Sequence, residues 1–129
     1  MMGGTKVDAK KILLIDDEMA FCDVVKENVE LRGGYRIHVS NNGKDGLRAA
    51  RTFKPDLIIL DLRMPVMDGF KVLEELKKDN ATLGIPVIVM TALEDDASKA
   101  RVSSLYGDRY LVKPVKIGEL LSKIAEVLG

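Results

Sequence analysis

The 129-residue sequence has a single cysteine, no excess of either charge and no long apolar run. One cysteine, Cys22, excludes an internal disulfide and agrees with a reducing compartment. Lysine plus arginine and aspartate plus glutamate each number 20, so bulk charge favours neither nucleic acid nor a membrane surface. No run approaches the roughly 20 apolar residues of a membrane span, and residues 1–9 carry no signal-peptide core. We therefore expect a cytoplasmic protein that binds no membrane and does not bind nucleic acid directly.

The length is that of one domain. A chain of 129 residues can bury about two thirds of the surface that it exposes when unfolded. Residues 1–10, which include Gly3 and Gly4, are expected to be a disordered lead-in, and residues 11–129 to form the domain.

Short aliphatic runs alternate with amphipathic segments along the chain. The expected strands are Lys11–Ile15, Tyr35–Ser40, Leu57–Leu60, Val87–Met90 and Arg109–Val112. Five helices are expected. The first precedes Gly33 and has Phe21, Val24, Val25 and Leu31 on its apolar face, and the third has Phe70, Leu73 and Leu76. The second, fourth and fifth are Gly43–Phe53, Asp95–Tyr106 and Ile117–Val127. Five strand–helix units predict an α/β fold with a parallel sheet between two helix layers.

The stretch from Asp56 to Gly69 carries the first functional signal. Its continuous apolar run, Leu57–Leu60, is typical of a parallel strand that is covered on both faces, and Asp61 follows this run directly. Ligands of open α/β sheets bind beyond the carboxyl ends of the strands. Taken alone, an aspartate here is more often a turn or helix cap.

Polar residues of this kind also follow three of the other four expected strands, and together with Asp61 they form one set. The set comprises Asp16, Asp17, Asp61, Thr91 and Lys113. Each has an ordinary explanation when taken singly, because acids begin helices, threonine caps them and lysine is usually solvated. All strands of a parallel sheet end at one edge, however, so the five residues should converge. Their joint occurrence favours a site.

Clustered carboxylates repel one another unless a cation or protons offset their charge. Mg²⁺ prefers oxygen ligands, a lysine suits phosphoryl oxygens, and a threonine supplies a hydroxyl donor. This set suits aspartyl-phosphate chemistry in which Asp61 is the nucleophile, and a carboxylate needs no general base because it is already deprotonated.

Four segments of the chain carry a resemblance to a known family. They are Leu-Leu-Ile-Asp-Asp-Glu (13–18), Ile-Ile-Leu-Asp-Leu-Arg-Met-Pro-Val-Met-Asp-Gly (58–69), Val-Ile-Val-Met-Thr-Ala (87–92) and Tyr-Leu-Val-Lys-Pro (110–114). From Lys11 to Leu128 the chain resembles the response-regulator receiver domain of two-component signalling. The resemblance implies a flavodoxin-like (βα)5 three-layer sandwich with strand order 2-1-3-4-5.

The resemblance also implies roles for individual residues. Asp61 would be the phosphoacceptor and a ligand of Mg²⁺. Asp17 and the backbone carbonyl of Arg63 would also bind the metal directly, and Asp16 would act largely through metal-bound water.

Thr91 would donate a hydrogen bond to the phosphoryl group and Lys113 would pair with it, and the Lys113–Pro114 peptide bond would be cis. Tyr110 would be the switch aromatic, although the residues alone favour an ordinary strand position.

Some positions depart from the family pattern. Gly107 sits one place late, so Tyr106 either packs locally or contacts a partner. Arg63 and Leu93 occupy positions that tune the lifetime of the phosphoryl group in the family. His38 lies on the expected edge strand, far from the acidic cluster, and is not a phosphohistidine candidate.

Three classes of function are compatible with this sequence. The leading hypothesis is a single-domain response regulator, a monomer or weak phosphorylation-dependent dimer, that takes a phosphoryl group from a histidine kinase or histidine phosphotransfer protein. It would signal to a downstream protein through the face formed by the fourth helix, fifth strand and fifth helix. The alternatives are a phosphorylation-independent binding module and a phosphohydrolase. Arg63 argues against the hydrolase, because such enzymes commonly carry an aspartate at that position, and we expect no enzyme acting on external substrates.

Overall fold

The computed structural model describes residues 9–92, 100–101 and 109–129. The elements are β1 (Lys11–Ile15), α1 (Met19–Asn28), a π-helical turn η1 (Val29–Gly33), β2 (Arg36–Ser40), α2 (Gly43–Thr52), β3 (Leu57–Asp61), α3 (Gly69–Lys78), β4 (Val87–Thr91), β5 (Tyr110–Val112) and α5 (Ile117–Leu128). Leu93, Tyr106 and most of the helix expected over Asp95–Tyr106 lie outside the described residues.

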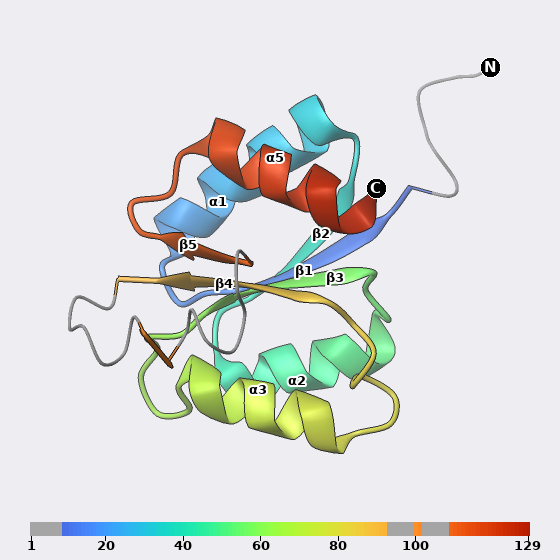
Figure 1. Ribbon diagram of the computed structural model, residues 1–129, viewed down its shortest axis with the longest axis vertical. Coiled ribbons are helices and arrows are strands. Elements are labelled where there is room, and N and C mark those ends of the chain that lie inside the picture. Colours follow the sequence, from blue (N-terminus) through green and yellow to red (C-terminus); the bar gives the residue numbers. More distant parts are fainter. Residues whose placement is uncertain (1–8, 93–99, 102–108) are drawn as a thin grey trace.

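The strands form one sheet with the order β2-β1-β3-β4-β5, and every neighbouring pair is parallel. Figure 1 shows α1 and α5 over one face of the sheet and α2 and α3 over the other. The predicted flavodoxin-like three-layer arrangement and its strand order are therefore confirmed. Within the described ranges, no helix combines the length and hydrophobicity needed to cross a bilayer.

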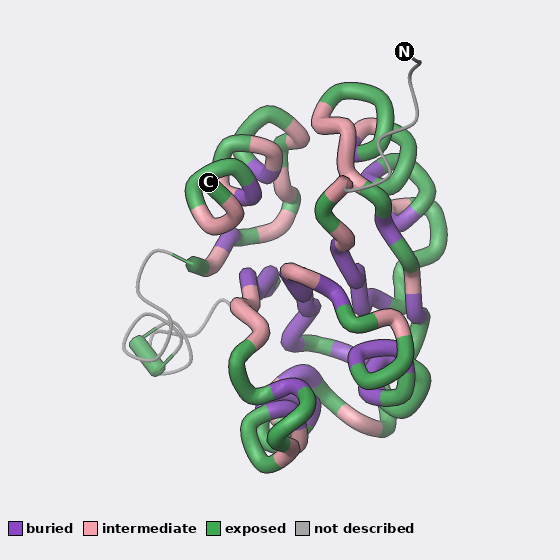
Figure 2. The backbone as a smooth tube through the Cα atoms, turned by 90° about the vertical axis from the view of Figure 1, so that its right-hand side faces the viewer, coloured by how far each residue is buried: buried purple, intermediate pink, exposed green. Residues whose placement is uncertain are grey.

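The central strands β1 and β3 hold the core together. Successive side chains of a strand point to opposite faces, so Leu13 and Ile58 pack toward α2 and α3, whereas Ile12 and Ile59 pack toward α1 and α5. All four are fully buried, and Figure 2 shows these buried strands between helices that expose their outer surfaces. Burial of each such side chain stabilises the fold by about 1.5–3 kcal/mol. The strand ends are thus fixed points from which polar side chains can be placed.

The apolar face predicted for the first helix was partly wrong. Val24 and Leu31 are 50% and 79% exposed, while Cys22, Val25 and Val29 are buried. The buried three are spaced by three and four residues and form one stripe, in which the thiol of Cys22 serves as a small apolar group. Burial raises the pKa of Cys22 to about 12, which keeps this thiol protonated and unreactive.

Two strands run one residue further than the sequence predicted. Asp61 is the last residue of β3 and Thr91 the last of β4, and both side chains are buried. The predicted strands stopped where hydrophobicity stopped, but parallel pairing continues through the polar residue, with Asp61 opposite Met90. The two polar side chains therefore start from hydrogen-bonded backbone rather than from a loop.

Val66 lies in the loop between β3 and α3 with a left-handed φ of 68°. This conformation is strained for a β-branched residue, and the side chain of Val66 is fully exposed, so it contributes no burial in return. We predict that Val66→Asn raises the free energy of unfolding by about 1 kcal/mol and Tm by about 3 °C, measured by thermal unfolding. Val66→Thr retains the β-branch and should give no gain. Equal effects of the two substitutions would contradict the strain.

Candidate functional site

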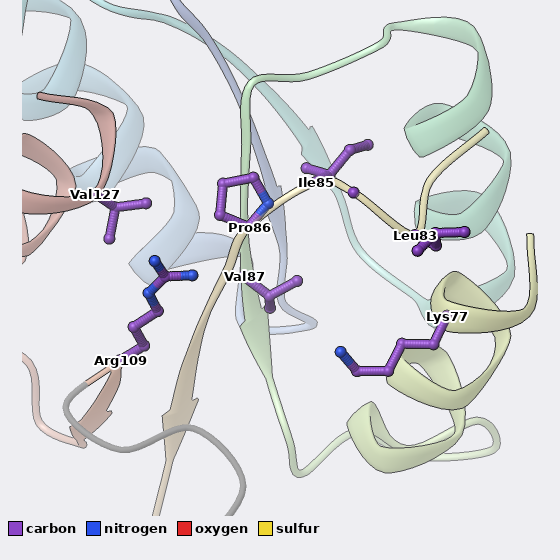
Figure 3. Close-up of a pocket in the computed structure, with 8 residues that line it drawn as sticks. Lys77, Leu83, Ile85, Pro86, Val87, Arg109 and Val127 are labelled. Atoms are coloured by element: carbon purple, nitrogen blue, oxygen red, sulfur yellow. The ribbon is translucent and has the colours of Figure 1, made fainter. Parts of the chain in front are cut away.

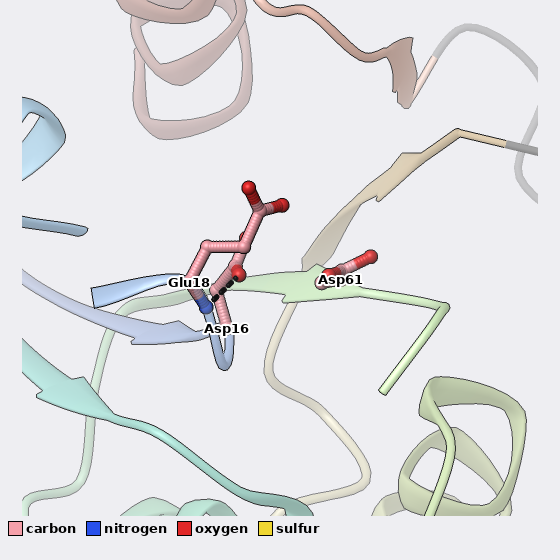
Figure 4. Close-up of side chains that lie close together, drawn as sticks. All are labelled: Asp16, Glu18 and Asp61. Atoms are coloured by element: carbon pink, nitrogen blue, oxygen red, sulfur yellow. Dashed lines mark hydrogen bonds between the residues drawn. The ribbon is translucent and has the colours of Figure 1, made fainter. Parts of the chain in front are cut away.

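Three strands deliver charged side chains to the carboxyl edge of the sheet. Asp16 directly follows β1, Asp61 ends β3, and Lys113 directly follows β5. The Lys113 Nζ lies 2.8 Å from Asp16 Oδ2 and 3.3 Å from Asp61 Oδ2. It also lies 2.6 Å from Oε1 of Glu18, in the turn between β1 and α1. Figure 4 shows that the three acidic side chains lie close together at this edge. We call Asp16, Glu18, Asp61 and Lys113 the acid–lysine cluster.

Backbone amides orient the two buried carboxylates. The N–H of Glu18 donates to Asp16 Oδ1 at 2.9 Å, and the N–H of Arg63 donates to Asp61 Oδ1 at 3.0 Å. In each carboxylate this leaves Oδ2 for the ammonium of Lys113. The same local pattern, a carboxylate accepting from the amide two residues later, therefore aims both acids at one point.

Gly69 sets how closely α3 approaches the end of β3. Its N–H donates to the carbonyl of Leu62 at 3.1 Å. A Cβ at Gly69 would lie 2.5 Å from the carbonyl oxygen of Asp61 and 2.5 Å from Cα of Leu62. Asp68 caps the helix by accepting from the N–H of Lys71 at 3.0 Å. The sequence Asp68-Gly69 therefore begins α3 directly against the backbone of Asp61.

The position of Lys113 is fixed by its backbone and by a ring. Its N–H donates to the carbonyl of Thr91 at 2.8 Å, and the Lys113–Pro114 bond is cis, as the resemblance implied. The Nζ also lies 4.7 Å from the ring centroid of Phe21 on α1, a contact that favours a cation. The side chain is only 11% exposed.

The electrostatics of the acid–lysine cluster reflect burial and a surplus of negative charge. Burial raises the pKa of Asp16 and of Asp61, although Lys113 and backbone N–H groups act in the opposite direction. Burial by itself would lower the pKa of Lys113, but hydrogen bonds to Asp16 and Glu18 outweigh it, so this pKa is raised. When all groups are charged, three carboxylates and one ammonium leave a net charge of −2. Burial thus sets the direction of the two carboxylate shifts, and the acidic partners set the direction of the Lys113 shift.

A divalent cation fits this charge and these donors. One carboxylate oxygen each from Asp16, Glu18 and Asp61 lies within 4.8 Å of the others. Hard oxygen donors of this kind suit Mg²⁺, which is held by one or two carboxylates and keeps several waters.

The site differs in one respect from the residues singled out by sequence. Asp17, the ligand implied by the resemblance, is exposed, and among the described residues it is not part of this group of three, whereas Glu18 is. The roles of Asp17 and of the Arg63 carbonyl remain predictions. The only sequence signal for Glu18 was its place directly after the acidic pair.

The remaining predicted residues lie as follows. Thr91 is buried at the end of β4. Tyr110 begins β5, is half-buried and packs against the core on the side of α2 and α3. Arg63 is exposed beside the cluster. His38 is exposed on the edge strand β2, where its ring contacts that of Phe53, and it is not part of the cluster.

A cavity of about 610 Å³ lies at the opposite end of the sheet, where β4 begins. Figure 3 shows Lys77 and Arg109 on either side of the Pro86–Val87 segment. None of its lining residues belongs to the acid–lysine cluster. The cavity therefore has no part in the chemistry of Asp61.

Removing the buried charge of Asp61 should stabilise the protein. The folded-state pKa of Asp61 is raised above 3.8, mainly by burial, so the folded state binds the proton more tightly than the unfolded state. Stability therefore falls as pH rises through the folded pKa, and the loss persists at neutral pH. We predict that Asp61→Asn raises the free energy of unfolding by about 1 kcal/mol at pH 7 without Mg²⁺, measured by urea unfolding.

The gain should disappear near pH 3, where the carboxyl is protonated in both states. Asp68→Asn is a matched control, because asparagine caps a helix as well as aspartate does and this side chain is exposed. A gain for Asp61→Asn that is equal at acid and neutral pH would contradict the buried-charge explanation.

The fold and the site together define a flavodoxin-like α/β domain that carries an acid–lysine cluster at the carboxyl edge of its sheet. The family model of the response regulator receiver domain matches residues 12–125. The chain belongs to this family of two-component signalling domains.

Relatives and solved structures agree with this assignment. The chain is 38% identical over 118 residues to the DNA-binding dual master transcriptional regulator RpaA of Synechocystis sp., covering 92% of this chain and 48% of RpaA. It is 34% identical over 119 residues to the alkaline phosphatase synthesis transcriptional regulatory protein PhoP of Bacillus subtilis, covering 92% and 48%. The Francisella response regulator 1452 receiver domain has a TM-score of 0.81 at 31% identity, covering 92% of this chain and 95% of that one. The chain spans about half the length of these two curated relatives.

Proposed function

We propose that the protein accepts a phosphoryl group on Asp61 from a phosphohistidine of a histidine kinase or histidine phosphotransfer protein. The observation that carries this proposal is the buried Asp61 carboxylate, whose Oδ2 faces the ammonium of Lys113 at 3.3 Å. In the proposed step, a carboxylate oxygen of Asp61 forms a bond to phosphorus while the bond from phosphorus to the donor nitrogen breaks. The electron pair of that bond leaves with the imidazole, which takes up a proton.

The residues of the cluster would divide the work as follows. The N–H of Arg63 holds Asp61 in place through Oδ1, so the attacking carboxylate keeps one orientation. Lys113 places a positive charge where the transferring group gains negative charge, and Thr91 supplies a hydroxyl donor at the end of the adjacent strand. Mg²⁺ would be held by Asp16 and Asp61 with oxygen atoms of Asp17, Glu18 or the Arg63 carbonyl. The chemistry that it supplies when bound is neutralisation of phosphoryl charge.

We propose further that phosphorylation signals by conformational switching and that the domain does not turn over external substrates. Thr91 and Tyr110 are the candidate switch residues, because they lie on neighbouring strands. Tyr110 of β5 is opposite Val89 of β4, the strand that ends at Thr91. A shift of Thr91 toward a phosphoryl group would therefore also displace β5 and Tyr110. The output surface would include β5 and α5, which are part of the face of fourth helix, fifth strand and fifth helix that the family resemblance suggests for a downstream protein.

The proposal is tested by weighing the intact chain after incubation with Mg²⁺ and acetyl phosphate. In this reaction Asp61 displaces acetate, and the wild type is expected to gain one phosphoryl mass. The gain should be absent from Asp61→Asn and suppressed by a chelator. Asp68→Asn removes a carboxylate from the same loop but retains the helix cap, and should be phosphorylated normally.

Two outcomes would reverse the conclusion. No adduct on the wild type, together with binding to a partner that does not depend on Asp61, would identify a phosphorylation-independent binding module. Sustained turnover of a small phosphate ester would identify a phosphohydrolase.

A further inference from the structure

Glu18 occupies the N-cap position of α1 but does not cap the helix. No hydrogen bond from a backbone N–H of α1 reaches its side chain. Serine, threonine, aspartate and asparagine are the residues that normally fill such a position, and glutamate is too long to cap in the same way. The side chain instead extends to the ammonium of Lys113 at 2.6 Å. The sequence thus has a non-capping residue where its length allows it to reach the lysine.

The contact with Glu18 completes the hydrogen bonding of Lys113. An ammonium group has three N–H donors. In this structure they face Asp16 Oδ2, Glu18 Oε1 and Asp61 Oδ2. An oxygen of an approaching phosphoryl group can therefore gain a hydrogen bond from Lys113, before its bond to Asp61 forms, only if one existing contact is given up.

Of the three acceptors, Glu18 is the one that can leave. Asp16 is fully buried and is held by the N–H of Glu18, and Asp61 is itself the phosphoacceptor of the proposed function. The Glu18 side chain is 62% exposed, so its carboxylate can move into water at little cost.

From this geometry we propose that Glu18 is a positioning residue that withholds the Lys113 ammonium in the phosphate-free protein and so slows phosphorylation of Asp61. The inference rests on the proposed function. An exposed ion pair of this kind is weak, so the expected effect is a modest adjustment of rate rather than a requirement for activity.

The test compares rate constants of phosphorylation by acetyl phosphate at saturating Mg²⁺, with Mg²⁺ affinity measured separately by titration. Glu18→Ala removes both the charge and the contact, and Glu18→Asp keeps the charge but shortens the reach. Both should raise the saturating rate constant by about two- to fivefold. Glu27→Ala, an exposed acid on the same helix, is the matched control and should leave it unchanged.

Three results would overturn the proposal. A Glu18→Asp rate equal to wild type would show that charge, not contact, matters. A lower saturating rate in both variants would show that Glu18 assists Lys113. An effect on Mg²⁺ affinity alone would make Glu18 a metal ligand instead.

A second measurement separates this inference from the proposed function. In the phosphate-free protein, the hydrogen-bonded Lys113 ammonium should give a slowly exchanging NMR signal, whose exchange is faster in Glu18→Ala than in the wild type and unchanged in Glu27→Ala. If the wild type takes up no phosphoryl group, the proposed function fails and so does the rate effect, while this signal still decides whether Glu18 holds Lys113. An exchange rate in Glu18→Ala equal to that of the wild type would show that Glu18 does not hold Lys113.

Discussion

Replacing Lys113 by methionine should both destabilise the protein and nearly abolish its phosphorylation. The substitution leaves Asp16 and Asp61, two buried carboxylates, without the ammonium that pairs with both. Breaking a buried pair by removing one partner costs about 3 kcal/mol or more. Loss of a positive charge aimed at the transferring group should lower the phosphorylation rate constant by about 100- to 1000-fold.

The stability of Lys113→Met is measured by urea unfolding at pH 7 without Mg²⁺, and its phosphorylation by intact mass. The loss of stability should shrink in acid, because carboxyl groups whose pKa is raised by burial destabilise the fold only when they are ionised. Lys116→Met, an exposed position nearby, should retain both stability and phosphorylation. Unchanged stability of Lys113→Met at pH 7 would contradict the buried pairing.

The second large effect is expected for Gly69→Ala. The added Cβ would meet the carbonyl oxygen of Asp61 and Cα of Leu62, each at 2.5 Å. Both atoms belong to the backbone at the end of β3, so α3 and the strand must move apart. We predict a loss of about 2–3 kcal/mol in the free energy of unfolding. A displacement of Asp61 by about 1 Å would also slow phosphorylation by up to about 100-fold.

Gly118→Ala in α5 is the control for this substitution, because a Cβ there meets nothing within 4 Å. Alanine is a better helix former than glycine, so Gly118→Ala should stabilise the protein by up to about 1 kcal/mol. Urea unfolding of the two variants should therefore show opposite signs. A Gly69→Ala variant as stable and as readily phosphorylated as the wild type would show that α3 can retreat from β3 without consequence.

The parts of the structure that depend on pattern were predictable from sequence. The apolar run Leu57–Leu60 indicated a buried parallel strand, and parallel strands ending at one edge brought Asp16, Asp61 and Lys113 together as expected. The strand order and the cis bond before Pro114 followed from the family resemblance rather than from periodicity.

Other features depend on geometry that a sequence does not specify. The apolar face expected for the first helix was wrong at Val24 and Leu31, which are exposed. Leu31 lies in the π-helical turn η1, where the 3.6-residue period of an α-helix does not apply. The contact from Glu18 to Lys113 joins side chains 95 residues apart, and it depends on which way a long side chain leaves a turn. Neither helical periodicity nor motif spacing contains that direction.

The central claim is that Asp61 itself carries the phosphoryl group. An aspartyl phosphate is reduced by borohydride to homoserine, so peptide mass spectrometry of the treated protein identifies the modified position. After incubation with Mg²⁺ and acetyl phosphate, homoserine should be found at position 61 and nowhere else. Homoserine at position 16 or 17, the corresponding reduced residue at position 18, or no reduced residue in a phosphorylated chain would contradict the assignment of Asp61 as the phosphoacceptor.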